Sequence, residues 1–168
     1  ALPIAEKLHN AGCEVHAIIG FRNKDLVILE EEFEKVSAEV HLMTDDGSSG
    51  TKGLVTDALE SLINAGNVYD EVIAIGPLVM MKFVTLLTKK YNIKTIVSMN
   101  PIMIDGTGMC GCCRLTVGGK TKFACVDGPD FDGFQVDFDE AISRSKSYLE
   151  FEKRSREKMC NLLKKEVN

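Results

Sequence analysis

The chain has 168 residues, of which 45% are hydrophobic and 27% charged, the length and composition of one ordinary folded domain. These fractions exclude a disordered or low-complexity chain, and no run approaches the roughly 18 apolar residues of a membrane-spanning helix. A formal charge of −5 argues against nucleic-acid binding, because phosphate contacts need a basic face. We therefore expect a globular protein with no nucleic-acid or membrane partner.

Residues 1–99 alternate between helix-like and strand-like segments. Apolar residues at helical spacing predict helices over residues 1–11, 26–36, 53–65 and 78–90. Short apolar runs predict buried strands over residues 15–19, 40–43, 72–75 and 95–99. This alternation predicts an α/β fold with a Rossmann-like parallel sheet covered on both faces. Because the alternation starts on a helix, and the sequence on Ala1 rather than methionine, we expect a fragment that lacks its first strand.

The ends of the predicted strands are the places where such a sheet binds ligands. The four predicted strands are followed by Gly20 and Arg22, by the polar turn 44–50, by Gly76 with Pro77, and by Asn100. Glycine there either serves a strand-to-helix turn or lets a ligand approach the backbone, and both possibilities stay open. The acidic residues at 45 and 46 are likewise either a plain turn or acceptors for ribose hydroxyls.

The pattern changes after Pro101, where residues 105–138 are rich in glycine, cysteine and aspartate. Gly118-Gly119, between residues 115–117 and 122–124, predicts a β-hairpin. A last helix is predicted from Asp139 nearly to the end of the chain, with sparse apolar positions that suit either a helix docked on a partner or a solvated one.

Four of the six cysteines lie between positions 110 and 125. The plant-type [2Fe–2S] loop has the spacing C-x4-C-x2-C with a distant fourth cysteine. This chain has the spacing Asp-x4-Cys-x2-Cys-x11-Cys over Asp105, Cys110, Cys113 and Cys125, so Asp105 takes the place of the first cysteine. A carboxylate oxygen is a suitable ligand for ferric iron, and nearby glycines let the loop wrap closely. The spacing therefore predicts a [2Fe–2S] site with these four ligands.

A zinc site or disulfides would also use cysteines. Zinc would bind Cys110, Cys112 or Cys113, and Cys125. Disulfides need an oxidising compartment. Because the sequence shows no export signal, we expect the protein to be cytoplasmic and its cysteines not to form disulfides. We expect Cys13 and Cys160 to be inert buried thiols, and Cys112 to be a non-ligand beside the cluster.

Residues 100–111 with 123–129 resemble the small subunit of NADH-dependent ferredoxin–NADP oxidoreductases, also described as sulfide dehydrogenases, which are related to the electron-transfer subunit of dihydroorotate dehydrogenase. Residues 44–48 and 74–77 resemble the pyridine-nucleotide half of ferredoxin reductases, so the resemblance covers essentially the whole chain. The resemblance implies that Asp105, Cys110, Cys113 and Cys125 are the cluster ligands. Because dihydroorotate dehydrogenase subunits use four cysteines, Asp105 favours the ferredoxin–NADP oxidoreductase branch of the family. The resemblance also implies a site for NAD(H) or NADP(H) lined by Gly20, Arg22, Asp45, Asp46, Gly47, Ser48, Gly76, Pro77 and Met80.

The resemblance further implies that the chain is divided into three parts. Residues 1–100 correspond to a truncated NAD(P)H-binding domain, residues 101–138 to the [2Fe–2S] module, and residues 139–168 to a C-terminal helix. Family members begin with a flavin-binding barrel, which these residues lack. Electrons would pass from NAD(P)H through FAD in that missing domain to the cluster, and on to a larger flavoprotein subunit.

This fragment alone would catalyse nothing, because hydride has no flavin to reach. Arg22 suits a 2′-phosphate, but the acidic turn favours NADH over NADPH. The alternative function is a zinc-stabilised nucleotide-binding or interaction module without a redox role.

Overall fold

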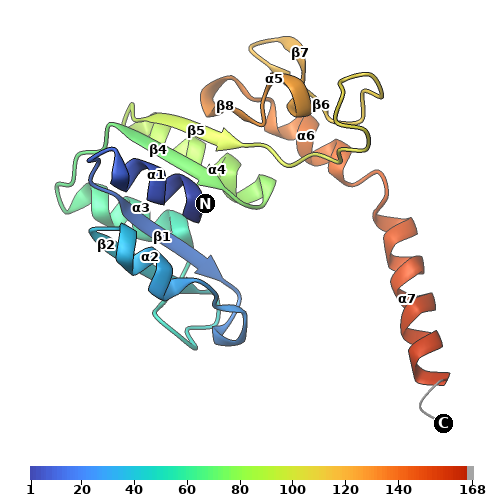
Figure 1. Cartoon of the computed structure of the whole chain (residues 1–168), viewed down its shortest axis with the longest axis horizontal. Coiled ribbons are helices and arrows are strands. Elements are labelled where there is room, and N and C mark those ends of the chain that lie inside the picture. The colour runs from blue at the N-terminus through green and yellow to red at the C-terminus, as the bar shows by residue number, and fades with distance from the viewer. Residues whose placement is uncertain (166–168) are drawn as a thin grey trace. The chain divides into compact units, whose positions relative to one another are not determined.

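A computed structural model describes the backbone of residues 1–165 and the side chains of residues 1–157 (Figure 1). The chain divides into two compact units, Ala1–Asp70 and a second that starts at Glu71. Both units contain parallel strands and helices, which confirms the predicted α/β class. Among the described residues, no helix combines the length and apolar character needed to cross a membrane.

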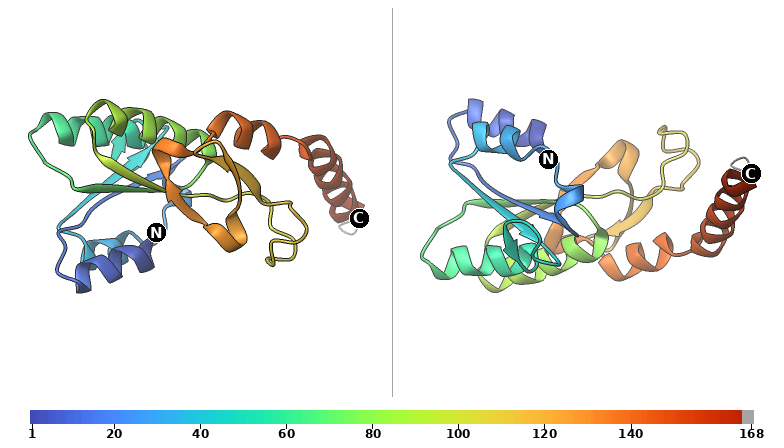
Figure 2. Two further views of the ribbon diagram at one scale, coloured as in Figure 1. Left: turned by 90° about the horizontal axis from the view of Figure 1, so that it is seen from above. Right: turned by 90° about the horizontal axis from the view of Figure 1, so that it is seen from below.

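The first unit contains a parallel three-stranded sheet in the order β1-β2-β3. Strand β1 (His16–Phe21) pairs with β2 (Glu39–Thr44) from His16 opposite Glu39 to Phe21 opposite Thr44, and β2 pairs with the short β3 (Thr51–Lys52). Helices α1 (Leu2–Asn10) and α2 (Glu30–Val36) lie on one face of β1 and β2, and α3 (Val55–Asn64) lies on the other (Figure 2). The sheet of this unit is therefore covered on both faces.

The core of the first unit lies between α1, α2 and the sheet. It is formed by Ala5, Ala17 and Phe33, with partly buried apolar side chains packed around them. The predicted helix over residues 26–36 was wrong at its start, because Leu29 has a left-handed backbone (φ 60°) and α2 begins only at Glu30. A short 3-10 turn, Lys24–Leu26, occupies part of the remainder.

The second unit contains a sheet in the order β4-β5-β8. Strands β4 (Glu71–Ile75) and β5 (Lys94–Ser98) are parallel and are joined by α4 (Leu78–Lys90). Strand β8 (Asp130–Asp132), which we did not predict, pairs antiparallel with β5 and is followed by the 3-10 turn Gly133–Gln135. The predicted hairpin is confirmed as β6 (Arg114–Val117) and β7 (Lys120–Phe123), which are followed by the short helix α5 (Ala124–Asp127).

Helix α4 anchors the core of the second unit. Met81 on α4 and Val97 on β5 are fully buried. Two buried threonines link the same elements, because the Thr95 hydroxyl lies 2.6 Å from the Thr88 hydroxyl, which in turn donates to the carbonyl of Val84 at 3.1 Å. The hydroxyls of Thr88 and Thr95 thus both have partners, as burial of polar groups requires.

The single C-terminal helix predicted from Asp139 was also wrong in detail, since two helices occupy this region. Helix α6 (Phe138–Ser145) is capped by the Asp137 side chain, which accepts from the Glu140 N–H. Helix α7 (Leu149–Lys165) follows after residues 146–148. The thiol predicted to be inert at Cys160 lies outside the described side chains, and Cys13 is exposed rather than buried.

Strands β1 and β4 each stand at one end of their strand order, so each pairs along one edge only within the described residues. Both are apolar strands of parallel sheets, and an edge strand leaves backbone N–H and C=O groups open to pairing with a further strand. The expected additional strand stays a prediction, as do the domain limits at residues 100 and 138.

Candidate functional site

Cys113 and Cys125 lie side by side at the base of the hairpin. Their Sγ atoms are 3.2 Å apart, and the neighbouring Ala124 N–H donates to the Cys113 carbonyl at 3.2 Å. Cys113 is buried (2% exposed), whereas Cys125 is partly exposed. Arg114, which follows Cys113, pairs with Phe123, which precedes Ala124 and Cys125, and this first pair of the hairpin keeps the two thiols close to each other.

Asp105 and Cys110 form a second pair in the loop that precedes the hairpin. One Asp105 carboxylate oxygen accepts the Thr107 N–H at 3.0 Å, and the other accepts the Cys110 N–H at 3.2 Å. The hydrogen bond from Thr107 is the main reason that the pKa of Asp105 lies below its usual range. The carboxylate is therefore ionised and held next to the Cys110 backbone.

Backbone donors also affect the thiols. The N–H of Cys125 lowers the pKa of Cys113, and this effect outweighs the burial of the thiol. The pKa of Cys125 is raised by its contact with the Cys113 thiol, and that of Cys112 is raised by a hydrogen bond with Cys110. Of these three thiols, Cys113 is the one whose surroundings favour the thiolate that metal binding requires.

The predicted ligands thus occur as two pairs. Within the described part of the chain, no three or more His, Cys, Asp or Glu residues converge on a point where a metal ion could bind. Two thiolates on one tetrahedral metal with 2.3 Å bonds lie about 3.8 Å apart, so the Cys113 and Cys125 sulfurs, 3.2 Å apart, would have to separate slightly to share an ion. A backbone hydrogen bond from Gly108 to the Cys125 thiol joins the loop of the first pair to the second. The donor set is therefore two neighbouring pairs, and four ligands are the number that a [2Fe–2S] cluster needs.

The predicted nucleotide-binding residues of the first unit follow β1 and β2. The N–H groups of Asp45 and Asp46 donate to the carbonyls of Phe21 and Arg22 at 3.1 and 3.4 Å, which brings these two strand ends together. Gly20 has a packing role, because a Cβ there would lie 2.5 Å from the Val55 side chain of α3. The structure accounts for Gly20 without a ligand.

The acidic turn is organised by its own side chains. The Asp46 carboxylate accepts both the N–H and the hydroxyl of Ser48, at 2.9 and 2.6 Å, and the Ser48 oxygen accepts the Lys24 N–H at 2.8 Å. The Asp45 side chain is exposed and takes part in none of these bonds. Asp46 therefore shapes the turn together with Gly47, and Asp45 is the better placed acceptor for a ligand.

The stability of this turn should depend on pH through the charge of Asp46. The hydrogen bond from the Ser48 hydroxyl is the main cause that holds the pKa of Asp46 below its ordinary value. A lowered folded-state pKa means that the stabilisation is present above the unfolded-state pKa and is lost as pH falls through the folded-state value. We expect Ser48→Ala to raise the pKa of Asp46 towards its ordinary value, measured by NMR titration of the carboxyl carbon. An unchanged pKa in this variant would show that Ser48 does not hold the carboxylate.

The remaining predicted residues lie at the end of β4. A Cβ at Gly76 would lie 2.5 Å from the terminal methyl of Met80, so these two residues are in contact, with Pro77 between them in sequence and exposed. The Asn100 side chain donates to the Gly76 carbonyl at 3.3 Å and was not among the predicted site residues. Its position directly after the fourth predicted strand was the available sequence clue.

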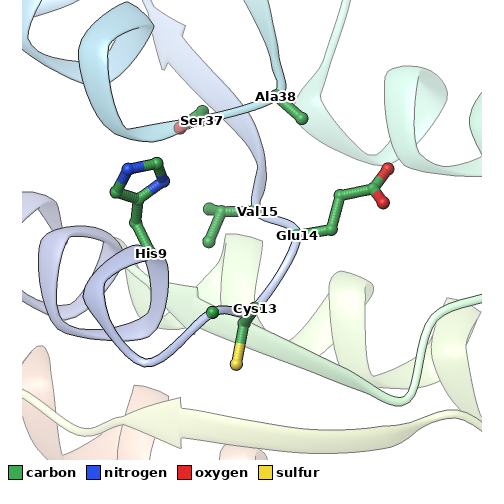
Figure 3. A pocket seen from close by; sticks show the side chains of 7 residues that line it. His9, Cys13, Glu14, Val15, Ser37 and Ala38 are labelled. Atoms are coloured by element: carbon green, nitrogen blue, oxygen red, sulfur yellow. The ribbon is translucent and has the colours of Figure 1, made fainter.

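A separate open cavity of about 380 Å³ lies at the other ends of β1 and β2 (Figure 3). The His9 side chain projects towards Ser37, whereas the side chains of Cys13 and Glu14 point away from Ser37 (Figure 3). The Ser37 hydroxyl is buried without a hydrogen-bond partner. None of the predicted ligands lines this cavity, which is therefore distinct from the two candidate sites.

Comparison with known proteins identifies the region that holds the paired ligands. Residues 100–137 match the iron–sulfur cluster binding domain of dihydroorotate dehydrogenase B. Over 156 residues, which make up 93% of the chain, the sequence is 50% identical to a dihydroorotate dehydrogenase B (NAD(+)) electron transfer subunit homolog of Thermotoga maritima. This chain belongs to the dihydroorotate dehydrogenase B electron-transfer subunit family. A probable member from Methanocaldococcus jannaschii is 37% identical over 134 residues.

A solved structure described as an NADH-dependent reduced ferredoxin–NADP oxidoreductase has the same fold, with a TM-score of 0.84 and 46% identity over 95% of this chain. The chain spans only about half the length of these family members: 55% and 50% of the two relatives, and 57% of the solved chain. The family resemblance predicted from residues 100–111 and 123–129 is thus confirmed, and the individual ligands remain predictions.

Proposed function

We propose that this chain is the pyridine-nucleotide and iron–sulfur part of an electron-transfer subunit. In the whole subunit, electrons would pass from NAD(P)H to FAD held by residues outside this chain, then to a [2Fe–2S] cluster, and finally to a larger flavoprotein subunit. The observation that carries the proposal is the presence of two ligand pairs, Asp105 with Cys110 and Cys113 with Cys125, inside the matched domain.

In this proposal each pair would hold one iron ion. The cluster supplies one-electron transfer when it is bound, and the protein supplies the ligands and their surroundings. Cys113 anchors the site in the core of the second unit, and the Asp105 carboxylate adds a hard oxygen ligand at the exposed side. Cys112 is a neighbouring thiol without a ligand role.

A bound [2Fe–2S] cluster has a composition and a colour that test this directly. We expect the purified chain, or the chain after anaerobic reconstitution, to contain about two iron and two sulfide ions per molecule, with broad visible absorption. The alternative, a zinc-stabilised nucleotide-binding or interaction module, predicts a colourless protein with one zinc ion and no sulfide. Two separate ligand pairs favour the iron–sulfur cluster, because zinc requires all four ligands around one point.

The nucleotide site in this proposal uses the ends of β1 and β2. Asp45 accepts hydrogen bonds from ribose hydroxyls, Asp46, Gly47 and Ser48 shape the turn, and the exposed Arg22 side chain is available to a 2′-phosphate. Gly20 in the first unit, and Gly76, Pro77 and Met80 in the second, remain proposed nucleotide-binding residues. The acidic turn favours NADH over NADPH, because a carboxylate repels a 2′-phosphate.

Substitution of Asp45 should weaken nucleotide binding more than it disturbs the fold. We expect Asp45→Ala in the full-length subunit to raise the Kd for NADH about tenfold or more, since a charged hydrogen bond is lost. Asp25→Ala, which removes an exposed carboxylate from the same unit, serves as the control and should leave the Kd unchanged. Equal affinities of Asp45→Ala and the parent subunit for NADH, measured by fluorescence titration, would contradict the assignment.

The remaining parts of the proposal concern the whole protein. The flavin domain supplies the immediate hydride acceptor, so residues 1–168 alone are expected to show no NAD(P)H-dependent reductase activity. The proposed location is the cytoplasm, and the proposed functional unit is a complex with the larger flavoprotein subunit. Residues 1–100, 101–138 and 139–168 remain its proposed parts.

A further inference from the structure

Two arginine side chains contact the cysteine loop from outside it. Arg114, on β6, donates to the carbonyl of Gly111 at 3.1 Å. Arg144, in the last turn of α6 and 32 positions along the chain from its partner, donates to the carbonyl of Cys112 at 3.4 Å. Successive carbonyls of the loop between Cys110 and Cys113 are thus held by guanidinium groups from two different elements.

Arg144 reaches this loop, while the acid that would usually pair with it on the helix is engaged elsewhere. An acid four positions earlier on a helix ordinarily pairs with an arginine. Here that acid is Glu140, whose carboxylate accepts the backbone N–H of Thr116 on β6 at 3.0 Å. The ion pairs seen among the described side chains have histidines, Lys82, Lys94 or Lys122 as their cations, and neither arginine is among them.

We propose that Arg144 is a positioning residue for the cluster site, an inference that rests on the proposed function. The peptide plane between Cys112 and Cys113 is rigid and trans. By holding the Cys112 carbonyl, Arg144 also sets the direction of the Cys113 N–H, which points away from that carbonyl. It thereby orients the backbone of the buried cysteine that anchors the site.

Arg144 also places a positive charge beside this site. A [2Fe–2S] centre with three thiolates and one carboxylate carries a net negative charge, which increases by one on reduction. A partly buried cation a few ångströms from the loop stabilises that added electron. Arg144 therefore raises the reduction potential of the cluster, whereas the more exposed Arg114 acts mainly through its hydrogen bond.

A purely structural role for Arg144 makes a different prediction. A cation in the last turn of a helix is favoured by the helix dipole, whatever lies beyond it. In that case Arg144 and the neighbouring Lys146, at the end of the same helix, would be equivalent. Only the positioning role requires that one of them affect the cluster and the other not.

The test is an EPR-monitored redox titration of the cluster-loaded chain and three variants. Arg144→Gln removes the charge, Arg144→Lys keeps it, and Lys146→Gln is the control with the same change in net charge. We expect Arg144→Gln to make reduction about tenfold less favourable, equivalent to about 59 mV for one electron. The potentials of Arg144→Lys and Lys146→Gln should stay close to that of the parent. Circular dichroism checks the fold of each.

A second measurement, the rate of iron loss to a chelator, reports on the loop itself. Because lysine cannot reproduce the guanidinium contact, we expect faster iron loss from Arg144→Lys and Arg144→Gln than from Lys146→Gln. Equal potentials and equal release rates in Arg144→Gln and Lys146→Gln would overturn the positioning role while leaving the cluster assignment intact. A parent chain that binds no iron and sulfide would overturn the proposed function and this inference together.

Discussion

Replacement of Cys113 by serine is expected to abolish cluster assembly, with at least about a tenfold loss of bound iron and sulfide. Cys113 is the most buried of the predicted ligands at 2% exposure, and backbone hydrogen bonds lower its pKa. A serine hydroxyl does not ionise near neutral pH and cannot replace the thiolate. Iron and sulfide quantification after anaerobic reconstitution measures the effect.

Cys112→Ser is the matched control, because it removes the adjacent thiol from the same loop. We expect this variant to retain the iron, sulfide and visible spectrum of the parent chain. Cys125→Ser should behave like Cys113→Ser, since the two sulfurs lie 3.2 Å apart and form one pair. Loss of iron from Cys112→Ser with retention in Cys113→Ser would show that the ligand assignment is wrong.

Substitution of Gly50 should cause a large loss of stability in the first unit. Gly50 has a φ of +61°, and a Cβ there would overlap the carbonyl oxygen of Leu42 on β2. We expect Gly50→Ala to lower the free energy of unfolding by about 2–4 kcal/mol, from backbone strain and this collision. Urea unfolding followed by circular dichroism measures the change.

Gly12→Ala separates the two causes. Gly12 has a φ of +85°, but a Cβ there would have no neighbour within 4 Å. This variant therefore incurs only the backbone cost, about 1 kcal/mol. If both variants lost the same stability, the collision with Leu42 would have no energetic effect, and the β2 turn would be looser than the structure shows.

Local patterns were enough to predict most of the elements. The Gly118-Gly119 turn predicted the hairpin, because a two-residue turn with positive φ needs glycine and the flanking strands pair directly beside it. The start of α2 could not be predicted in this way. Leu29 continues an apolar helical spacing, yet its left-handed backbone, an uncommon conformation for leucine, delays the helix to Glu30.

The alternation of strands and helices, the family, and the spacing from Asp105 to Cys125 could all be predicted from the sequence, since each depends on residues that are near one another in the chain. The residues that act on the cysteine loop from a distance became apparent only in the folded structure. Strand β8 pairs with β5, and Arg144 reaches Cys112, across intervals that carry no periodic pattern. Such contacts arise when packed elements bring distant backbone groups within hydrogen-bond range, and short-range spacing contains no record of them.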